Sequence, residues 1–218
     1  MIDLHTHTLL SDGELIPSEL ARRAEVKGYT HLGFADHADS SNLDLVVPRL
    51  VQAVREIGPH LKVKLLAGIE LTHVPPPLFR SLTERARALG AEYVVAHGQS
   101  PVEPVAPGTN RAALEAGVDL LAHPGLLTEE EAALAAEKGV LLEISTRRGH
   151  SLTNGHVARL ARAAGAGLVI NTDTHVVGDL VDDEFARLVV RGAGLEPGEF
   201  ERLQARALEF IRRLRPAG

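Results

Sequence analysis

The chain lacks cysteine and tryptophan, and only 3% of its 218 residues are aromatic. Without cysteine there is no disulfide framework, no thiolate metal site and no cysteine nucleophile. Because aromatic residues are so few, a hydrophobic core has to be built from Leu, Val, Ile and Ala. Hydrophobic residues still make up 44% of the chain and charged residues 24%, a balance typical of globular proteins and not of disordered or collagen-like ones.

Further absences bear on location and partners. No apolar run approaches the ~18–20 residues that cross a bilayer, so we expect no membrane association. Residues 1–5 lack the basic and apolar regions of a secretory signal, and we expect a cytoplasmic protein. The formal net charge of −6 argues against broad nucleic-acid binding, which usually needs a basic face. An amphipathic segment near the C-terminus is equally compatible with packing and with subunit pairing, so the sequence predicts no oligomeric state.

Short β-type runs alternate with longer amphipathic segments along the whole chain. The expected strands are residues 2–4, 31–35, 63–71, 93–96, 118–122, 140–144 and 167–170. The expected helices are residues 17–28, 42–57 (with a possible break at Pro48), 78–89, 109–116, 128–139, 154–164, 180–191 and 197–214. This alternation predicts a parallel sheet covered by helices. No linker or internal repeat divides the chain, so we expect a single domain over residues 1–218, as a closed barrel or an open sheet.

Imidazoles and carboxylates stand at the C-terminal ends of six of the seven expected strands, and in β/α barrels functional groups lie on that rim. The period of two along a strand points His5 and His7 to one side. Asp173 and His175 repeat that spacing, and barrel closure would bring the two pairs together. Imidazoles and carboxylates are ligands of Zn, Mn and Fe, and burying so many ionisable groups without metal would be costly. The residues concerned are His5, His7, Asp12, Asp36, His37, Glu70, His97, His123, Asp173 and His175.

The segments that carry these residues resemble the motifs of the PHP (polymerase and histidinol phosphatase) superfamily of metal-dependent phosphoesterases. The matching segments are residues 3–7 with 11–13, 35–37, 68–70, 96–98, 122–125 and 171–175. The resemblance covers essentially the whole chain and implies a distorted, TIM-like seven-stranded (β/α)7 barrel that holds up to three divalent metal ions (Zn, Mn or Fe). It implies that His5, His7, Glu70 and Asp173 hold the first metal, that Glu70 bridges to a second held by His97 and His123, and that Asp12, His37 and His175 hold the third. Asp12 stands where some relatives carry His.

The resemblance also implies a mechanism in which a metal-bridging hydroxide attacks phosphorus, with Glu70, Asp173 and His175 at the reaction centre. We expect Arg147 and Arg148 to bind the substrate phosphate, although a solvated loop would explain the pair equally well. His150 is the candidate proton donor to the leaving alkoxide. The other candidates for lining the substrate pocket are His73, Asn110 and Arg111, with helix capping as the alternative role of Asn110.

The leading hypothesis is a phosphatase that acts on a small phosphomonoester, similar to the histidinol-phosphate phosphatases. A nuclease or nucleotide phosphodiesterase of the same superfamily is the first alternative. An amidohydrolase-type metal hydrolase would have eight strands and often a modified bridging lysine, whereas the bridging position here is Glu70. A non-catalytic, RNA-associated barrel would not need to retain the metal ligands. The expected partner is therefore a small phosphorylated substrate.

Overall fold

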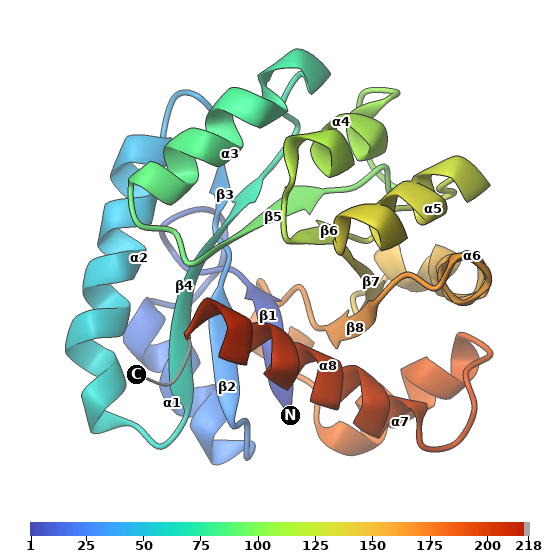
Figure 1. Ribbon diagram of the computed structural model, residues 1–218. Coiled ribbons are helices and arrows are strands. Elements are labelled where there is room, and N and C mark those ends of the chain that lie inside the picture. Colours follow the sequence, from blue (N-terminus) through green and yellow to red (C-terminus); the bar gives the residue numbers. More distant parts are fainter. Residues whose placement is uncertain (216–218) are drawn as a thin grey trace.

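Seven parallel strands form a nearly closed barrel in the computed structural model, which describes residues 1–215 (Figure 1). Each strand pairs with its neighbour in the order in which it is named here. The strands are β1 (Ile2–Thr6), β2 (His31–Phe34), β4 (Lys64–Leu71), β5 (Tyr93–His97), β6 (Leu120–Ala122), β7 (Leu141–Ser145) and β8 (Leu168–Asn171). A two-residue strand, β3 (His37–Ala38), extends the pairing on β4 beyond the end of β2. The predicted α/β barrel is confirmed, and the sequence missed only this short strand.

The barrel closes between β1 and β8 at a single bridge and not through a continuous ladder. Thr6 pairs with Thr174, and the backbone N–H of His7 donates to the Thr174 carbonyl at 2.8 Å. Lower in the barrel, the Asn171 side chain accepts the N–H of Leu4 at 2.9 Å and so replaces a missing ladder bond. Closure therefore brings the end of β1 beside the segment that follows β8, as the histidine spacing predicts.

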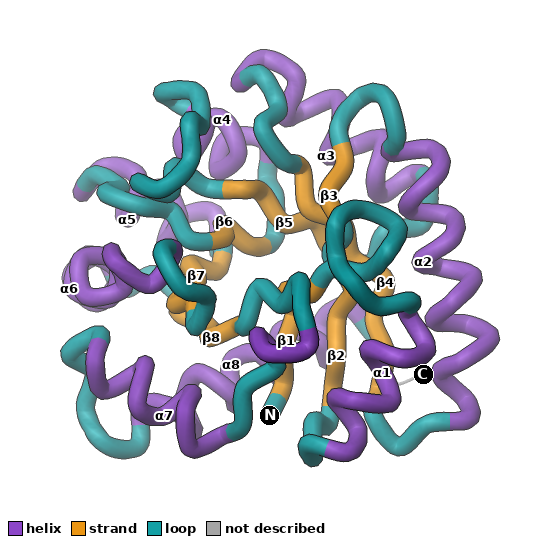
Figure 2. Tube along the Cα trace, turned by 180° about the vertical axis from the view of Figure 1, so that it is seen from behind, coloured by secondary structure: helices purple, strands orange, loops and turns teal. Residues whose placement is uncertain are grey.

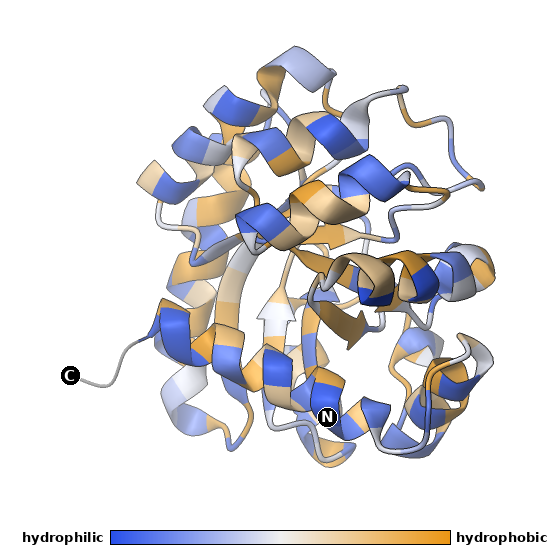
Figure 3. Cartoon of the chain, turned by 45° about the vertical axis from the view of Figure 1, so that its right-hand side comes forward, coloured by the Kyte–Doolittle hydropathy of each residue, from blue (hydrophilic) through white to orange (hydrophobic). Residues whose placement is uncertain are grey.

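Eight α-helices cover the outside of the barrel within the described residues. Figure 3 shows their apolar residues turned toward the strands and their hydrophilic residues turned outward. None of these helices combines the length and the apolar character that crossing a bilayer requires. The helices are α1 (Pro17–Val26), α2 (Leu43–Ile57), α3 (Phe79–Ala88), α4 (Thr109–Ala116), α5 (Glu129–Lys138), α6 (Asn154–Ala164), α7 (Asp183–Gly192) and α8 (Glu199–Leu214), with short 3-10 turns at Gly58–His60, Pro76–Leu78, His150–Thr153 and Val177–Asp179.

The helix starts follow their side-chain chemistry. At α5 a capping box forms in both directions: the Thr128 hydroxyl accepts the N–H of Glu131 at 3.1 Å, and the Glu131 carboxylate accepts the N–H of Thr128 at 2.8 Å. Helix α7 begins later than expected, because the Asp182 carboxylate caps it by accepting the N–H of Phe185. Pro48 does not break α2; it lies on the exposed side, where water can replace the hydrogen bond that proline cannot donate.

The barrel interior holds its own core, closed at one end by α8. Figure 1 shows α8 crossing the N-terminal ends of β1, β2 and β8. Phe210 and Ile211 of α8 pack on the inward side chains of the strands, and Gln204 hydrogen-bonds both backbone groups of Ile2. The interior at this end is therefore filled, and the polar side chains gather at the opposite, C-terminal rim.

Tyr93 is the largest side chain in the barrel interior and determines what its neighbours can be. Its hydroxyl donates to the Leu4 carbonyl at 2.8 Å, and its ring meets Phe210 edge-on with centroids 6.1 Å apart. Its ring lies so close to Gly68 of β4 that a Cβ there would be only 2.3 Å away. Glycine is required at position 68 because the aromatic ring occupies the place of a side chain.

Replacing Gly68 by Ala should lower the free energy of unfolding by about 1–3 kcal/mol, because the added methyl group must displace the Tyr93 ring. Gly192→Ala is the matched control: Gly192 lies at the end of helix α7 and has open space around its Cβ position. That control should leave stability unchanged or raise it by up to about 1 kcal/mol. Urea unfolding of both variants measures the difference, and equal stabilities would contradict this role of Tyr93.

Candidate metal centre

All nine side chains expected to bind metal lie together at the C-terminal rim. Figure 2 views the barrel from behind, where loops surround the strand ends. Seven of the nine are buried, whereas His37 is partly exposed and Asp12 is exposed. Their donor atoms form overlapping groups in which all atoms lie within 4.8 Å of one another. These groups are His5, His7 and Glu70; His5, His123 and Asp173; Glu70, His97 and His123; and His7, Asp12, His37 and His175.

Backbone geometry aims these side chains into the cluster. His5 lies on β1 and His7 directly follows it, with Thr6 between them, so the two imidazoles lie on one side with ring centroids 5.0 Å apart, while the Thr6 hydroxyl donates to the Gly33 carbonyl of β2. Two other members have the left-handed backbone that non-glycine residues rarely adopt: His123 at φ 26° and Asp173 at φ 53°. Such backbone costs of order 1–3 kcal/mol per residue and is concentrated at functional sites.

Several buried donor atoms in the cluster make no hydrogen bond. They are Nε2 of His5, Nε2 of His7, Oε1 of Glu70 and Oδ1 of Asp173. His5 Nε2 lies 3.3 Å from Glu70 Oε1, and His7 Nε2 lies 3.1 Å from Asp173 Oδ1. Buried polar atoms almost always have a partner, and a divalent cation would supply one to all four. The donor set therefore fits a metal ion, and its mixture of imidazole and carboxylate suits Zn, Mn or Fe.

Without metal, only some ligands are held in the form that binds metal: nearby carboxylates outweigh burial and raise the pKa of His5 and of His37, which favours their protonated rings. Burial, reinforced by neighbouring imidazoles, lowers the pKa of His7 and of His123 well below the usual value, which keeps both rings neutral. Burial alone would raise the pKa of Glu70, but His5 and His37 outweigh it and hold that pKa well below its ordinary range. Neutral imidazoles and an ionised carboxylate are the protonation states required for coordination.

Glu143 is a functional residue that the sequence reasoning missed. It is fully buried on β7; its Oε2 lies 2.8 Å from His5 Nδ1 and accepts a hydrogen bond from the Asn171 amide, while its Oε1 accepts the N–H of His123. A carboxylate on the far nitrogen of an imidazole orients the ring and makes it a better ligand. The available signal was a single acidic residue inside the otherwise apolar strand of residues 140–144.

Glu103 is the second residue that was missed. It lies in the loop between β5 and α4. Its Oε2 lies 3.1 Å from His73 Nε2 and 3.0 Å from His97 Nε2, and its Oε1 lies 3.3 Å from His150 Nε2. His150 and His97 hold the pKa of Glu103 below its usual value. Glu103 does not follow the end of a strand, so the pattern that identified the other candidates could not include it. Only its contacts in the folded structure place it at the cluster.

The structure places His150, His73 and Arg147 at the cluster. His150 is buried, with Nδ1 2.7 Å from the Ser100 hydroxyl and its ring stacked on His123 at 4.0 Å between centroids. His73 is more exposed and reaches the edge of the cluster through Glu103. The Arg147 guanidinium donates to Asp173 Oδ2 at 3.3 Å. His73 and Arg147 help to line a cavity of about 210 Å³, whose lining residues are Asp12, His37, Thr72, His73, His97, Glu103, His123, Arg147, Asp173 and His175.

Three other residues expected at the pocket lie elsewhere. Asn110 is buried and ties two loops together: its Oδ1 accepts the N–H of Gln99 at 3.0 Å, and its Nδ2 donates to the Pro124 carbonyl at 2.8 Å. Its amide is used in that link and does not face the cavity of the cluster. Arg111 is exposed on α4 and pairs with Glu115 at 2.9 Å. Arg148 is exposed and, unlike Arg147, lines only a neighbouring cavity.

Glu143→Gln should weaken metal binding by about 10–100-fold, because the amide supports His5 less well than a carboxylate does. Glu209→Gln is the control, since it removes the same charge from an exposed position on α8. Competition of each protein with a metal-binding dye for Zn²⁺ or Mn²⁺ measures the affinity. Equal affinity of Glu143→Gln and the control would show that Glu143 does not support the ligand.

Asp3 should make the stability of the metal-free protein depend on pH. Burial raises the pKa of its carboxyl from 3.8 to about 7, so the folded state binds a proton that the unfolded state has lost between these values. Stability from this group is therefore full below about pH 4 and falls as pH rises to about 7, by up to about 4 kcal/mol. Urea unfolding of chelator-treated wild type and Asp3→Asn between pH 4 and 8 tests this. Parallel pH profiles for the two proteins would contradict it.

Comparison with known proteins bears out the family resemblance. The model of the PHP domain family matches residues 3–134. An uncharacterized protein of Methanocaldococcus jannaschii is 46% identical over 201 residues, which cover 91% of this chain and 92% of that protein. A probable phosphatase of Shewanella frigidimarina is 27% identical over 240 residues, with 97% of this chain and 91% of that protein covered.

A solved structure shows the same fold. It is that of the histidinol phosphate phosphatase of Lactococcus lactis, complexed with zinc, L-histidinol and phosphate, and it matches with a TM-score of 0.65. The match covers 89% of this chain and 94% of that one at 18% identity, a level at which the likeness concerns the fold alone. The family match confirms the predicted class of metal-dependent hydrolase. Because the family model matches more than half of its residues, this chain belongs to the PHP domain family.

Proposed function

We propose that this chain, as one domain over residues 1–218, hydrolyses a small phosphomonoester, the reaction class of the histidinol-phosphate phosphatases. The observation that carries the proposal is the set of buried imidazole and carboxylate atoms without hydrogen bonds, beside the Arg147 guanidinium. A site that combines bound metal ions with one adjacent guanidinium can bind a phosphate dianion. The L. lactis enzyme of the same fold, complexed with zinc and phosphate, supports this reading.

Up to three divalent ions (Zn, Mn or Fe) would bind in the groups that the donor atoms form. When bound, such ions supply Lewis acidity, which lowers the pKa of water toward 7 and neutralises charge on phosphate oxygens. We assign His5, His7, Glu70 and Asp173 to the first ion, Glu70, His97 and His123 to the second, and Asp12, His37 and His175 to the third. Glu70, Asp173 and His175 are thereby the residues nearest the reacting phosphate.

Two residues beside the ligands have roles of their own. Arg147 is the phosphate anchor, because its guanidinium reaches the cluster and no other arginine of residues 1–215 lines that cavity. His150 is the proton donor to the leaving alkoxide. The Ser100 hydroxyl holds its Nδ1, which leaves Nε2 facing the cluster, 3.7 Å from Asp173 Oδ2. Burial of the ring beside His123 keeps bulk water away from that nitrogen.

The alternatives fit the site less well. The amidohydrolase-type reading expects eight barrel strands and a bridging lysine. Here the barrel path has seven strands, with β3 as an extension outside it, and Glu70 stands at the centre of the cluster. A cavity of about 210 Å³ and a net charge of −6 favour a small substrate over a nucleic-acid strand.

Hydrolysis of a panel of phosphates tests the proposal. The panel holds histidinol phosphate, mononucleotides, simple phosphomonoesters and a short single-stranded oligonucleotide, each with Mn²⁺ or Zn²⁺. We expect turnover of small monoesters that is abolished by a chelator and falls at least about a hundredfold in Asp173→Ala, which loses a central ligand. Arg147→Gln should raise KM or lower kcat, because the anchor for the phosphate is lost.

Glu209→Gln is the control and should match the wild type. Hydrolysis of the oligonucleotide alone would show that the protein is a nuclease and not a phosphomonoesterase. If Arg147→Gln has the same kcat and KM as the wild type, Arg147 does not bind the substrate phosphate.

A further inference from the structure

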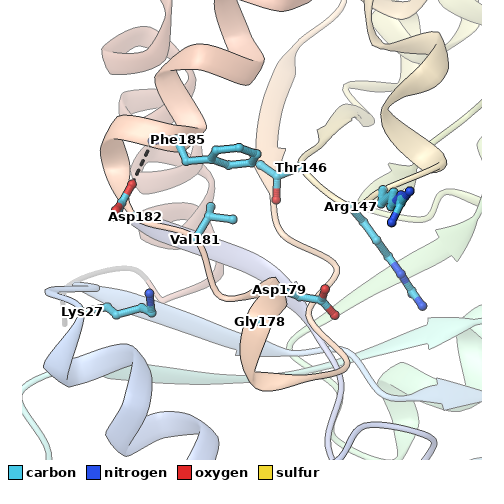
Figure 4. Close-up of a pocket in the computed structure, with 9 residues that line it drawn as sticks. Lys27, Thr146, Arg147, Gly178, Asp179, Val181, Asp182 and Phe185 are labelled. Carbon is cyan, nitrogen blue, oxygen red and sulfur yellow. Dashed lines mark hydrogen bonds between the residues drawn. The ribbon is translucent and has the colours of Figure 1, made fainter.

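A second cavity, of about 350 Å³, adjoins the metal cluster (Figure 4). It lies between the loop that follows β7, the segment that joins β8 to α7, and the end of α1. Arg147 lines both cavities, so its side chain is a wall that they share. A substrate whose phosphate contacts Arg147 therefore has this cavity directly beside it. The lining residues are Lys27, Thr146, Arg147, Arg148, Gly178, Asp179, Val181, Asp182 and Phe185.

The charged side chains that line the second cavity differ in whether they already have partners within the protein. Both carboxylates cap backbone: Asp179 accepts the N–H groups of His175 and Val176, and Asp182 accepts the N–H of Phe185. The side chains of Lys27 and Arg148, in contrast, form no ion pair or hydrogen bond with any residue among 1–215. In Figure 4 the Lys27 ammonium points into the space below Val181. The charges left for a ligand are therefore positive.

Two further features suit an organic ligand and not a solvated groove. The Thr146 hydroxyl is buried, has no hydrogen-bond partner and points into the cavity (Figure 4). An unpartnered buried hydroxyl is uncommon, and a ligand atom would satisfy it. The Phe185 ring, 47% exposed, forms an apolar wall with Val181 on the same side. A polar donor, two free cations and an apolar face together make a ligand subsite.

We propose that this cavity binds an anionic group, a carboxylate or a second phosphate, on the leaving group of the substrate phosphomonoester. The inference rests on the proposed function and narrows its substrate class. The positive charges of Lys27 and Arg148 on the walls of the cavity attract the anion, the Thr146 hydroxyl donates to it, and the carbon skeleton packs on Phe185. Histidinol phosphate, whose leaving group is cationic, is disfavoured by the same charges.

Paired substrates test this subsite. The series is 3-phosphoglycerate with a carboxylate, 1,3-propanediol bisphosphate with a second phosphate, glycerol 3-phosphate with a neutral leaving group, and histidinol phosphate with a cationic one. We expect kcat/KM for at least one anionic substrate to exceed that for glycerol 3-phosphate by about tenfold or more, with histidinol phosphate lowest. The two anionic substrates tell whether a carboxylate or a phosphate is preferred.

Substitutions in the second cavity test whether its side chains cause the preference for anionic substrates. Lys27→Gln with Arg148→Gln should reduce the ratio of anionic to neutral kcat/KM to about one, and Thr146→Val should lower the same ratio. The control, Lys64→Gln with Arg162→Gln, removes the same charge from two exposed positions outside both cavities and should keep the ratio. Thermal unfolding of each variant shows that it is folded.

Each negative result has a distinct meaning. Equal kcat/KM for neutral and anionic substrates, or a preference that survives in the Lys27 and Arg148 double variant, would overturn the subsite and leave the phosphatase standing. Failure of the metal-loaded wild type to hydrolyse any phosphomonoester would overturn the proposed function, and the subsite with it.

Discussion

Two buried carboxylates among imidazoles are the constraint on which the rest of this structure depends. Glu70 and Asp173 come from opposite parts of the barrel and meet the same histidines, His5, His7 and His123. The isolated burial of such charges costs several kcal/mol, and protein hydrogen bonds leave one oxygen of each carboxylate without a partner. The cluster is thus built for cations, and the protein bears a cost in stability that metal binding can offset.

The two ends of the barrel have different roles: one stabilises the fold and the other carries the metal ligands. At the N-terminal end, Tyr93 and the apolar face of α8, with Phe210, fill the interior. At the C-terminal end the inward positions are polar, and strained backbone at His123 and Asp173 aims their side chains at one point. Because β1 and β8 meet at one bridge there, the closure of the barrel and the assembly of the cluster are the same event.

The residues around the ligands decide how well the cluster works. Glu143 holds His5 from below, and Glu103 faces His73, His97 and His150 from a loop above. Arg147 stands between the cluster and the neighbouring cavity, so a contact with phosphate and the choice of leaving group are coupled through one side chain. A PHP-family barrel can in this way change its substrate through loops while the strand-borne ligands stay in place.

The sequence by itself determined the elements and the strand-end ligands, because these follow from local rules. Alternation along a strand puts His5 and His7 on one face, and the capping box of Thr128 and Glu131 starts α5 where the spacing predicts. The family motifs added the assignment of ligands to ions. Only the tertiary structure decided which loops approach the cluster: Glu103 joins it, Asn110 serves to link two loops, and Lys27 lines one cavity with Arg148, which follows it by 121 positions in the sequence. Such contacts depend on how separate segments pack, and no periodicity within a single segment encodes them.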